Sequence, residues 1–283
     1  MNKLILAIAG ILLPAIVVSA QISNFEVSHI YKTANSVYRI HTDDNHPVTD
    51  MLDVSHDSIG LYTTVDIAIQ WPTRFGDHDI TALQDTLLSR AFDVAPGTPV
   101  DLAIKQELAR PIGYGEDELT VATYAQLDAD TLRRRVVYNR SINLSTIGFC
   151  EKYIVYRCNH IEDRELWHPN LFRHFINYDM KTNRVIEFND IFLPDHEQQL
   201  LEIITQRLLD KYYAVSLEEL QKKSDIFADN IYVSREIYLT GDEVVFHYDP
   251  YEIGPWSIGE IDIHVPTHLL SDLLTDYARA LFY

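Results

Sequence analysis

Basic residues and cysteines are scarce in this 283-residue chain, and the only long apolar run lies in its first twenty residues. With 23 Lys and Arg against 42 Asp and Glu, the formal net charge is -19. A surface of this sign repels nucleic acid and anionic lipid, so we expect neither as a partner. Phosphate-cradling glycine-rich loops, dinucleotide fingerprints and the Gly-x-Ser-x-Gly elbow of serine hydrolases are also missing from the sequence.

The apolar run begins after Lys3 and ends at Ser19-Ala20. A basic start, a short apolar core and small residues at the end are typical of a secretory signal peptide. We therefore expect residues 1–20 to be a signal peptide, cleaved before Gln21. The mature protein would be periplasmic or secreted, with no transmembrane segment. An uncleaved anchor, which needs about 20 apolar residues, is the alternative interpretation.

Two cysteines, Cys150 and Cys158, are present, and export would permit a disulfide between them. The sequence from Phe149 to Cys158 has the composition of one continuous strand. Eight steps of about 3.3 Å would hold the two Cα atoms roughly 26 Å apart, whereas a disulfide needs about 5.5 Å. We therefore expect two separate thiols, unless a bend at Glu151-Lys152 folds the segment back.

Apolar residues that alternate with polar ones predict strands in several places. The clearest alternation runs from Ile59 to Trp71 and stops at Pro72, and another runs from Arg135 to Leu144. Further strands are expected at 24–31, 36–41, 149–158, 175–178, 184–188, 231–239, 244–248 and 261–265. The connection 179–183 predicts a hairpin in which Asn183 takes a left-handed conformation.

Capping residues predict where the helices begin. They are Asp79, Thr98-Pro99, Asp195, Ser216 and Thr267. Because strands and helices come in clusters rather than in strict alternation, we predict an α+β fold with mainly antiparallel sheets, helices packed on one face and two closely associated subdomains. The weakly patterned residues 111–130 mark the boundary, which gives domains at 21–130 and 131–283.

Three histidines, His160, His168 and His174, lie close together in a segment rich in acids. Imidazole and carboxylate are the usual ligands of zinc. However, the His-Glu-x-x-His spacing is missing, and Pro169 disfavours a helix that would align His168 with a partner. We interpret the segment as an exposed polar loop. The alternative is a metal site on these histidines, in a hydrolase or deacetylase-like accessory that acts on peptidoglycan.

The second half of the chain carries a series of specific motifs. They are Asn177-Tyr178-Asp179-Met180-Lys181-Thr182-Asn183, Asp190-Ile191-Phe192 and Tyr251-Glu252-Ile253-Gly254-Pro255-Trp256. In this order, residues 130–283 resemble the RsiV-like family of extracytoplasmic domains, which includes the C-terminal domain of a lysozyme-sensing anti-sigma factor. The strand before Pro72 and the helix from Asp79 resemble its N-terminal companion domain more weakly. The resemblance implies the fold and a lysozyme-like partner, but we expect no anti-sigma role without a membrane segment.

A stiff, aromatic-rich segment follows the strand at 244–248. Pro250 and Pro255 restrict the backbone on both sides of residues 251–254, so the segment would be ordered before a partner binds. Aromatic side chains dominate protein contact sites and stack on sugars. We predict the ligand-binding residues to be Tyr248, Tyr251, Glu252, Pro255 and Trp256. The alternative is that these aromatics plug the end of the core.

These observations predict an exported, non-catalytic binding protein of the cell envelope that uses no cofactor. Its ligand would be a cationic protein such as lysozyme or a peptidoglycan fragment. The acidic charge of the chain agrees in sign with a cationic partner.

Overall fold

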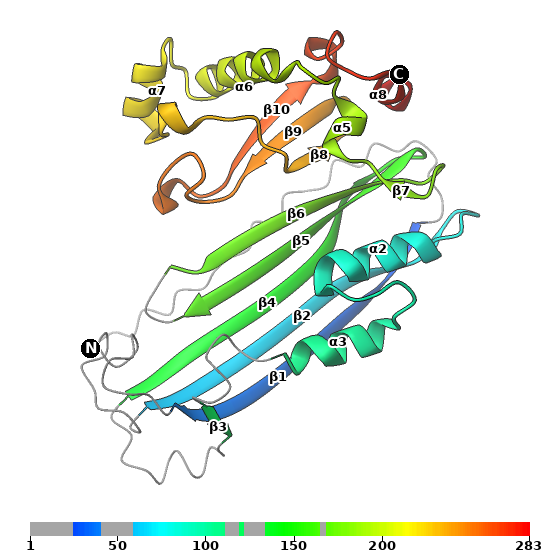
Figure 1. The fold of residues 1–283 in the computed structure, drawn as a ribbon, viewed down its shortest axis with the longest axis vertical. Coiled ribbons are helices and arrows are strands. Elements are labelled where there is room, and N and C mark those ends of the chain that lie inside the picture. Colours follow the sequence, from blue (N-terminus) through cyan, green and yellow to red (C-terminus); the bar gives the residue numbers. More distant parts are fainter. Residues whose placement is uncertain (1–24, 41–58, 111–118, 122–133, 165–167) are drawn as a thin grey trace.

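The computed structural model of the protein describes residues 25–40, 59–110, 119–121, 134–164 and 168–283, which Figure 1 draws in colour. The signal peptide predicted at residues 1–20 lies outside these described residues. Within the described part, no helix is both long and apolar enough to cross a membrane.

A seven-stranded sheet, here called the large sheet, forms the centre of the molecule (Figure 1). Its strand order is β3-β1-β2-β4-β5-β6-β7. The strands are β1 (Phe25–Ile40), β2 (Ile59–Phe75), β3 (Leu119–Val121), β4 (Arg134–Phe149), β5 (Tyr153–Arg164), β6 (Asn170–Asp179) and β7 (Arg184–Val185). Neighbouring strands are antiparallel, except that β2 and β4 run parallel. The β2–β4 pair joins strands from both predicted domains into one sheet, and the division into domains stays a prediction.

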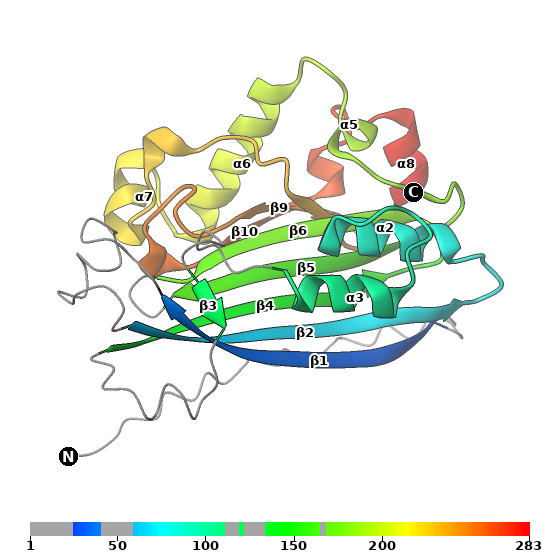
Figure 2. The ribbon, with the colours of Figure 1, turned by 60° about the horizontal axis from the view of Figure 1, so that its bottom comes forward.

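Helices α2 (Thr81–Phe92) and α3 (Val100–Leu108) pack on one face of the large sheet (Figure 2). The predicted alternation of β2 is confirmed, because Leu61, Val65, Ile67 and Ile69 are buried. The buried residues of α2, among them Leu83 and Leu87, pack in the core on this face of the sheet. The Asp79 carboxylate accepts a hydrogen bond from the Thr81 amide at 2.9 Å, which supports the start of α2.

A three-stranded antiparallel sheet, here called the small sheet, lies on the opposite face of β5 and β6 (Figures 1 and 2). It consists of β8 (Ile237–Leu239), β9 (Glu243–Tyr248) and β10 (Ile261–Pro266), with β9 in the middle. The helices of this half are α5 (Phe188–Ile191), α6 (Glu197–Lys211), α7 (Leu217–Ser224) and α8 (Asp276–Phe282). The α6 stripe Leu200, Ile204 and Leu208 packs on the small sheet. The predicted α+β fold is confirmed.

Alternate residues of β5 belong to two different cores. Tyr153 and Val155 face the small sheet, whereas Ile154, Tyr156 and Cys158 face α2 and α3. Side chains on a strand point to opposite faces in turn, so a strand that is covered on both faces is apolar at every position. This double coverage explains the apolar run Tyr153–Tyr156 at the start of β5.

The prediction of one strand through both cysteines is wrong. The chain turns at Glu151-Lys152, and the Cys150 amide donates a hydrogen bond to the Tyr153 carbonyl at 2.8 Å. The ammonium group of Lys152 donates to the last carbonyls of α8, where cations are favoured. Cys150 therefore lies in the hairpin turn, Cys158 lies inside β5, and both are free thiols.

Two helix starts were predicted wrongly. Asp195 has φ 64° and gives no cap, and α6 begins after His196 without a side-chain cap. The terminal helix begins later than expected, because Thr275 caps α8 while Thr267 opens a short 3-10 turn. Two other local predictions are confirmed: Ser216 caps α7, and Asn183 has φ 54°.

Strand lengths also differ from the sequence predictions. The strands predicted at 24–31 and 36–41 are replaced by one continuous strand, β1, which the structure describes from Phe25 to Ile40, and β2 continues through Pro72. A register shift at Glu26/Val27 opposite this proline accommodates the missing amide donor. The strand expected at 231–239 shortens to the three residues of β8.

Candidate functional site

The segment between β9 and β10 is fixed by hydrogen bonds that its own sequence supplies. The Glu252 carboxylate accepts from the Asp249 amide and from the Tyr232 hydroxyl, each at 2.6 Å. The Ile253 carbonyl accepts from the Phe227 amide at 2.8 Å, which ties the segment to the chain after α7. Gly254 is buried, and a Cβ there would collide with the Ile258 side chain. The turn is therefore built before any ligand arrives.

Three rings meet at this turn, and we call them the aromatic corner: Tyr251, Trp256 and His168. Tyr251 is 58% exposed, and Trp256 is half-buried. The imidazole of His168 stacks on the Trp256 ring at 5.4 Å and 18°, and the Tyr251 ring lies 5.9 Å from Trp256. His168 precedes β6 and is far from the turn in sequence. The structure thus adds it to the binding residues predicted here.

A hollow of about 370 Å³ opens beside the aromatic corner. Its lining residues are Glu162, Arg164, His168, Asn170 and Tyr251. Carboxylate, guanidinium and amide groups can exchange hydrogen bonds with hydroxyls, while the rings offer apolar faces. Such a mixture can hold a ligand that carries many hydroxyl groups on an apolar ring face.

Tyr248, which was predicted as a contact residue, lies in the core instead. Its side chain is 0% exposed, and its hydroxyl donates to the Tyr232 carbonyl at 2.5 Å. Burial raises the pKa of this phenol. The physical reason is that β9 is the central strand of the small sheet and is covered on both faces. Of the other predicted residues, Glu252 holds the turn and Pro255 borders a separate hollow with Phe227.

The alternative metal site is not assembled. His168 stacks in the aromatic corner, whereas His160 contacts the Cys158 thiol at 3.3 Å and His174 contacts Glu236 at 3.0 Å. Burial lowers the pKa of His160, and the hydrogen bond that His174 donates to Glu236 raises the pKa of His174. In the described part of the chain, no three His, Cys, Asp or Glu side chains group as metal ligands. Burial also raises the pKa of Cys158 to about 12, so its thiol stays protonated at neutral pH.

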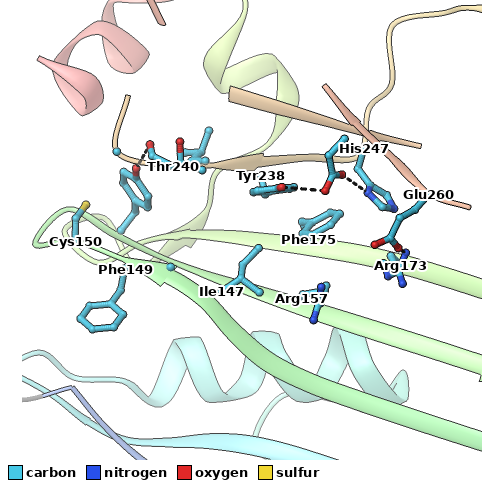
Figure 3. A pocket seen from close by; sticks show the side chains of 15 residues that line it. Ile147, Phe149, Cys150, Arg157, Arg173, Phe175, Tyr238, Thr240, His247 and Glu260 are labelled. Carbon is cyan, nitrogen blue, oxygen red and sulfur yellow. Dashed lines mark hydrogen bonds and ion pairs between the residues drawn. The ribbon is translucent and has the colours of Figure 1, made fainter. Parts of the chain in front are cut away.

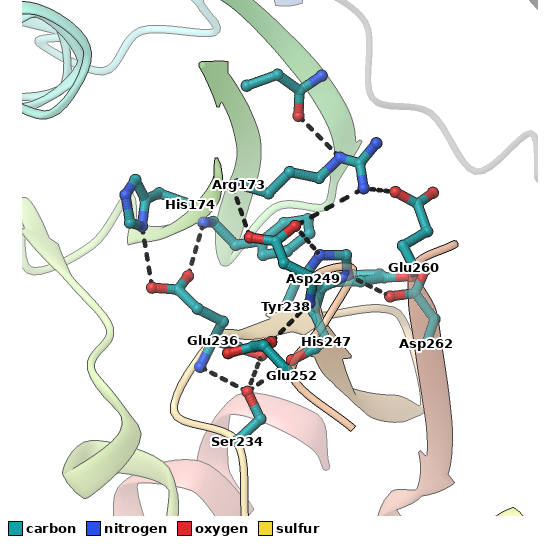
Figure 4. Close-up of polar contacts among 12 residues, drawn as sticks. Arg173, His174, Ser234, Glu236, Tyr238, His247, Asp249, Glu252, Glu260 and Asp262 are labelled. Atoms are coloured by element: carbon teal, nitrogen blue, oxygen red, sulfur yellow. Dashed lines mark hydrogen bonds and ion pairs between the residues drawn. The ribbon is translucent and has the colours of Figure 1, made fainter. Parts of the chain in front are cut away.

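A polar network between the two sheets was missed by the sequence prediction (Figure 4). The buried His247 has Nδ1 2.6 Å from Asp262 and Nε2 3.2 Å from Asp249, and Asp262 also accepts from the Tyr238 hydroxyl at 3.1 Å. Burial opposes protonation of His247, but the hydrogen bonds with both carboxylates outweigh it and raise its pKa. Among the buried residues of β9, His247 is the only one that can ionise near neutral pH. A histidine in an otherwise apolar strand was the sequence signal that could have indicated this network.

The network also joins the small sheet to the free edge of β6. Asp249 accepts from the Arg173 amide at 3.1 Å, and Glu236 accepts from the Phe175 amide at 3.3 Å. The Arg173 side chain pairs with Glu260 and donates to Asn159. Carboxylates thus occupy amide donors that an exposed sheet edge would offer to another strand.

A second cavity, the inter-sheet cleft, has a volume of about 440 Å³. Figure 3 shows Ile147, Arg157 and Phe175 along the large sheet, facing Tyr238 and His247 on the small sheet. The Phe175 ring packs 4.6 Å from Tyr238 and meets His247 edge-on at 5.0 Å. The cleft is therefore partly aromatic and partly charged.

The fold and the site define an α+β protein with a large and a small sheet and an aromatic surface corner. Residues 189–268 match the family described as "Protein of unknown function (DUF3298)". A solved structure of a DUF3298 family member from Bacteroides fragilis is similar, with 18% identity, a TM-score of 0.64, and 89% of this chain and 94% of that chain covered. Another, from Pseudomonas aeruginosa, has 14% identity, a TM-score of 0.54, and coverages of 91% and 97%. At these identities the likeness shows the fold alone. Comparison with curated proteins gave no significant match.

Proposed function

We propose that this chain is an exported, non-catalytic binding protein of the cell envelope, of the RsiV-like kind, that recognises a cell-wall glycan through the aromatic corner. The observation that carries the proposal is the stack of His168 on Trp256 beside a polar hollow. Sugar rings present apolar C–H faces to aromatic rings and hydroxyls to polar side chains. The corner supplies both kinds of contact within one hollow.

The rigidity of the turn supports this role. Glu252 and the buried Gly254 hold the backbone that carries Tyr251 and Trp256, so a ligand would meet rings that are already in place. Binding then costs less conformational entropy than binding to a loop that must first be ordered. Polar and aromatic groups in one hollow are also what a small-molecule site requires.

A cationic protein such as a lysozyme-like hydrolase is the second candidate ligand. The charge of -19 supports it, as does the exposed residue Glu252 in the turn that carries the corner. The resemblance of residues 130–283 to the RsiV-like family points to the same partner. Complementary charge would speed the encounter and make the affinity fall steeply with salt.

Isothermal titration calorimetry on the chain from Gln21 onward tests both candidates. The ligands are soluble peptidoglycan fragments and hen lysozyme, each measured at low and at high salt. We expect saturable fragment binding that is weakened by Tyr251→Ala and kept by Tyr213→Ala, a matched control because Tyr213 is an exposed tyrosine on another loop. Binding of lysozyme alone would select the second candidate. Absence of binding to both ligands would refute the proposed function, and a full-length precursor in the cytoplasm would refute export.

A further inference from the structure

Arg157 is a charged side chain that the network of the inter-sheet cleft leaves unpaired. It lies in β5 opposite Phe175 of β6, on the strand face that carries Tyr153 and Val155 toward the small sheet. Its Nε is buried and, within the described part of the chain, has no hydrogen-bond partner. Arg173, in the same cleft, differs because it pairs with Glu260 and donates to Asn159.

An unpaired guanidinium between two sheets is costly. A buried donor without a partner lowers stability, and it does so more strongly when it belongs to a charged group. Burial lowers the pKa of Arg173, and the nearby charge of Arg157 acts in the same direction. An anion placed beside Arg157 would satisfy its buried Nε–H and reduce the repulsion between Arg157 and Arg173. Guanidinium presents paired donors in a plane, which suits a carboxylate or another oxyanion.

The remaining walls of the cleft limit what such an anion can be. The Tyr238 hydroxyl and the His247 imidazole are already committed to Asp262. Ile147 and the ring of Phe175 offer apolar contacts instead. The carboxylates of Glu260 and Asp262 at the same cleft would repel a second negative charge on the ligand.

We propose that the inter-sheet cleft is a binding site for a small monoanion that carries a carboxylate on an apolar body. Arg157 anchors the carboxylate, and Ile147, Phe175 and Tyr238 contact the body. The site is separate from the aromatic corner and takes a different class of ligand, so it stands or falls independently of glycan recognition.

Sodium benzoate, which has one carboxylate and one ring, is the test ligand. Titration of the ¹⁵N-labelled chain should give saturable amide shifts at Gly148 and Gly241, which line the cleft. Benzyl alcohol, without the charge, and inorganic phosphate, without the apolar body, should each bind at least about tenfold more weakly. Arg157→Gln should weaken benzoate binding by a similar factor, and Arg157→Lys by less because it keeps the charge.

The matched control is Arg74→Gln, which removes an exposed arginine outside the cleft and should leave benzoate binding unchanged. Thermal unfolding checks the folding of each variant. Arg157→Gln should melt no earlier than the wild-type chain, because it removes an unpaired charge. The proposal is overturned if benzoate gives no saturable shifts at these glycines, or if folded Arg157→Gln binds it as tightly as wild type. Equal binding of benzyl alcohol would overturn the anchoring role of Arg157.

Discussion

Strand β9 and the aromatic corner that follows it use the same kinds of residue but meet solvent very differently. Tyr248 is 0% exposed and Tyr251 is 58% exposed, although only two residues separate them. His247 is enclosed by two carboxylates, whereas the ring of His168 is exposed and stacked on Trp256. The difference comes from coverage: α6 and the large sheet enclose β9, and the chain leaves both layers at Asp249-Pro250. Residue type alone therefore does not separate a binding surface from a core.

The largest effect expected from this comparison is on stability. Tyr248→Ala should lower the free energy of unfolding by about 3–5 kcal/mol, because a buried aromatic leaves a cavity. Its loss also leaves the Tyr232 carbonyl without its hydrogen bond. Urea unfolding followed by circular dichroism measures the change.

Tyr251→Ala is the matched surface variant and should change stability by only about 0.5 kcal/mol. If Tyr248→Ala were as stable as wild type and lost ligand binding instead, Tyr248 would belong to the contact surface, and the contrast between strand and corner would fail.

How far the sequence predicted this arrangement depends on what covers each strand. Strands with one covered face, such as β2 and β10, alternate and were found. β5 and β9 are covered on both faces, so their apolar runs revealed strands without revealing the turn at Glu151-Lys152 or the burial of Tyr248. These features depend on which helices and sheets cover each strand, and the local sequence pattern does not encode that coverage.

The candidate site was predicted only in its local part. Tyr251, Glu252 and Trp256 follow from one motif whose prolines and glycine fix a turn. His168 joins them from the start of β6, and the partners of His247 come from β10 and from beyond the end of β9. Such pairings depend on strand register and on how the sheets stack, which the sequence alone did not reveal.

The inter-sheet network is expected to give the next largest effect. His247→Ala should cost about 2 kcal/mol at pH 6, because two partly buried carboxylates lose a charged hydrogen-bond partner. Since the folded-state pKa of His247 is raised, the protonated network stabilises the fold fully below its ordinary value of 6.5, and this contribution is lost as pH rises through the folded-state pKa.

The stabilising contribution of Asp262 depends on pH in the opposite direction to that of His247. Burial raises the pKa of Asp262, but the hydrogen bond and the charge of His247, together with the hydrogen bond from Tyr238, outweigh burial and lower it. Its contribution is therefore present above 3.8 and is lost as pH falls through the folded-state value. Urea unfolding from about pH 5 to about pH 9 should therefore show a decline that is flatter in His247→Ala. His174→Ala is the control for the second histidine whose pKa is raised. Parallel pH profiles for His247→Ala and wild type would show that the network is not a stabilising element.

Trp256→Ala tests the exposed side of the comparison and should act mainly on binding. Loss of the stacked ring should weaken peptidoglycan-fragment binding at least about tenfold, or about 1.4 kcal/mol. The fold should persist, because Trp256 is only half-buried. Calorimetry and circular dichroism on the same preparation measure both quantities. Collapse of the fold in this variant would instead place Trp256 in the core, as Tyr248 is.

The smallest effect expected concerns backbone conformation. Tyr251 has φ 76°, a left-handed conformation that is unfavourable for a residue with a bulky side chain. Asn tolerates this region well, so Tyr251→Asn should raise the free energy of unfolding by up to about 1 kcal/mol while it weakens ligand binding.

Tyr213 provides the matched control, since it is 87% exposed and has φ 53°. Tyr213→Asn should give a similar gain in stability with unchanged binding. If both variants gained stability and both kept full binding, the strained backbone of Tyr251 would have no role in ligand binding. A gain in both with a binding loss only at Tyr251 would mean that the strain is retained because the ring contacts the ligand.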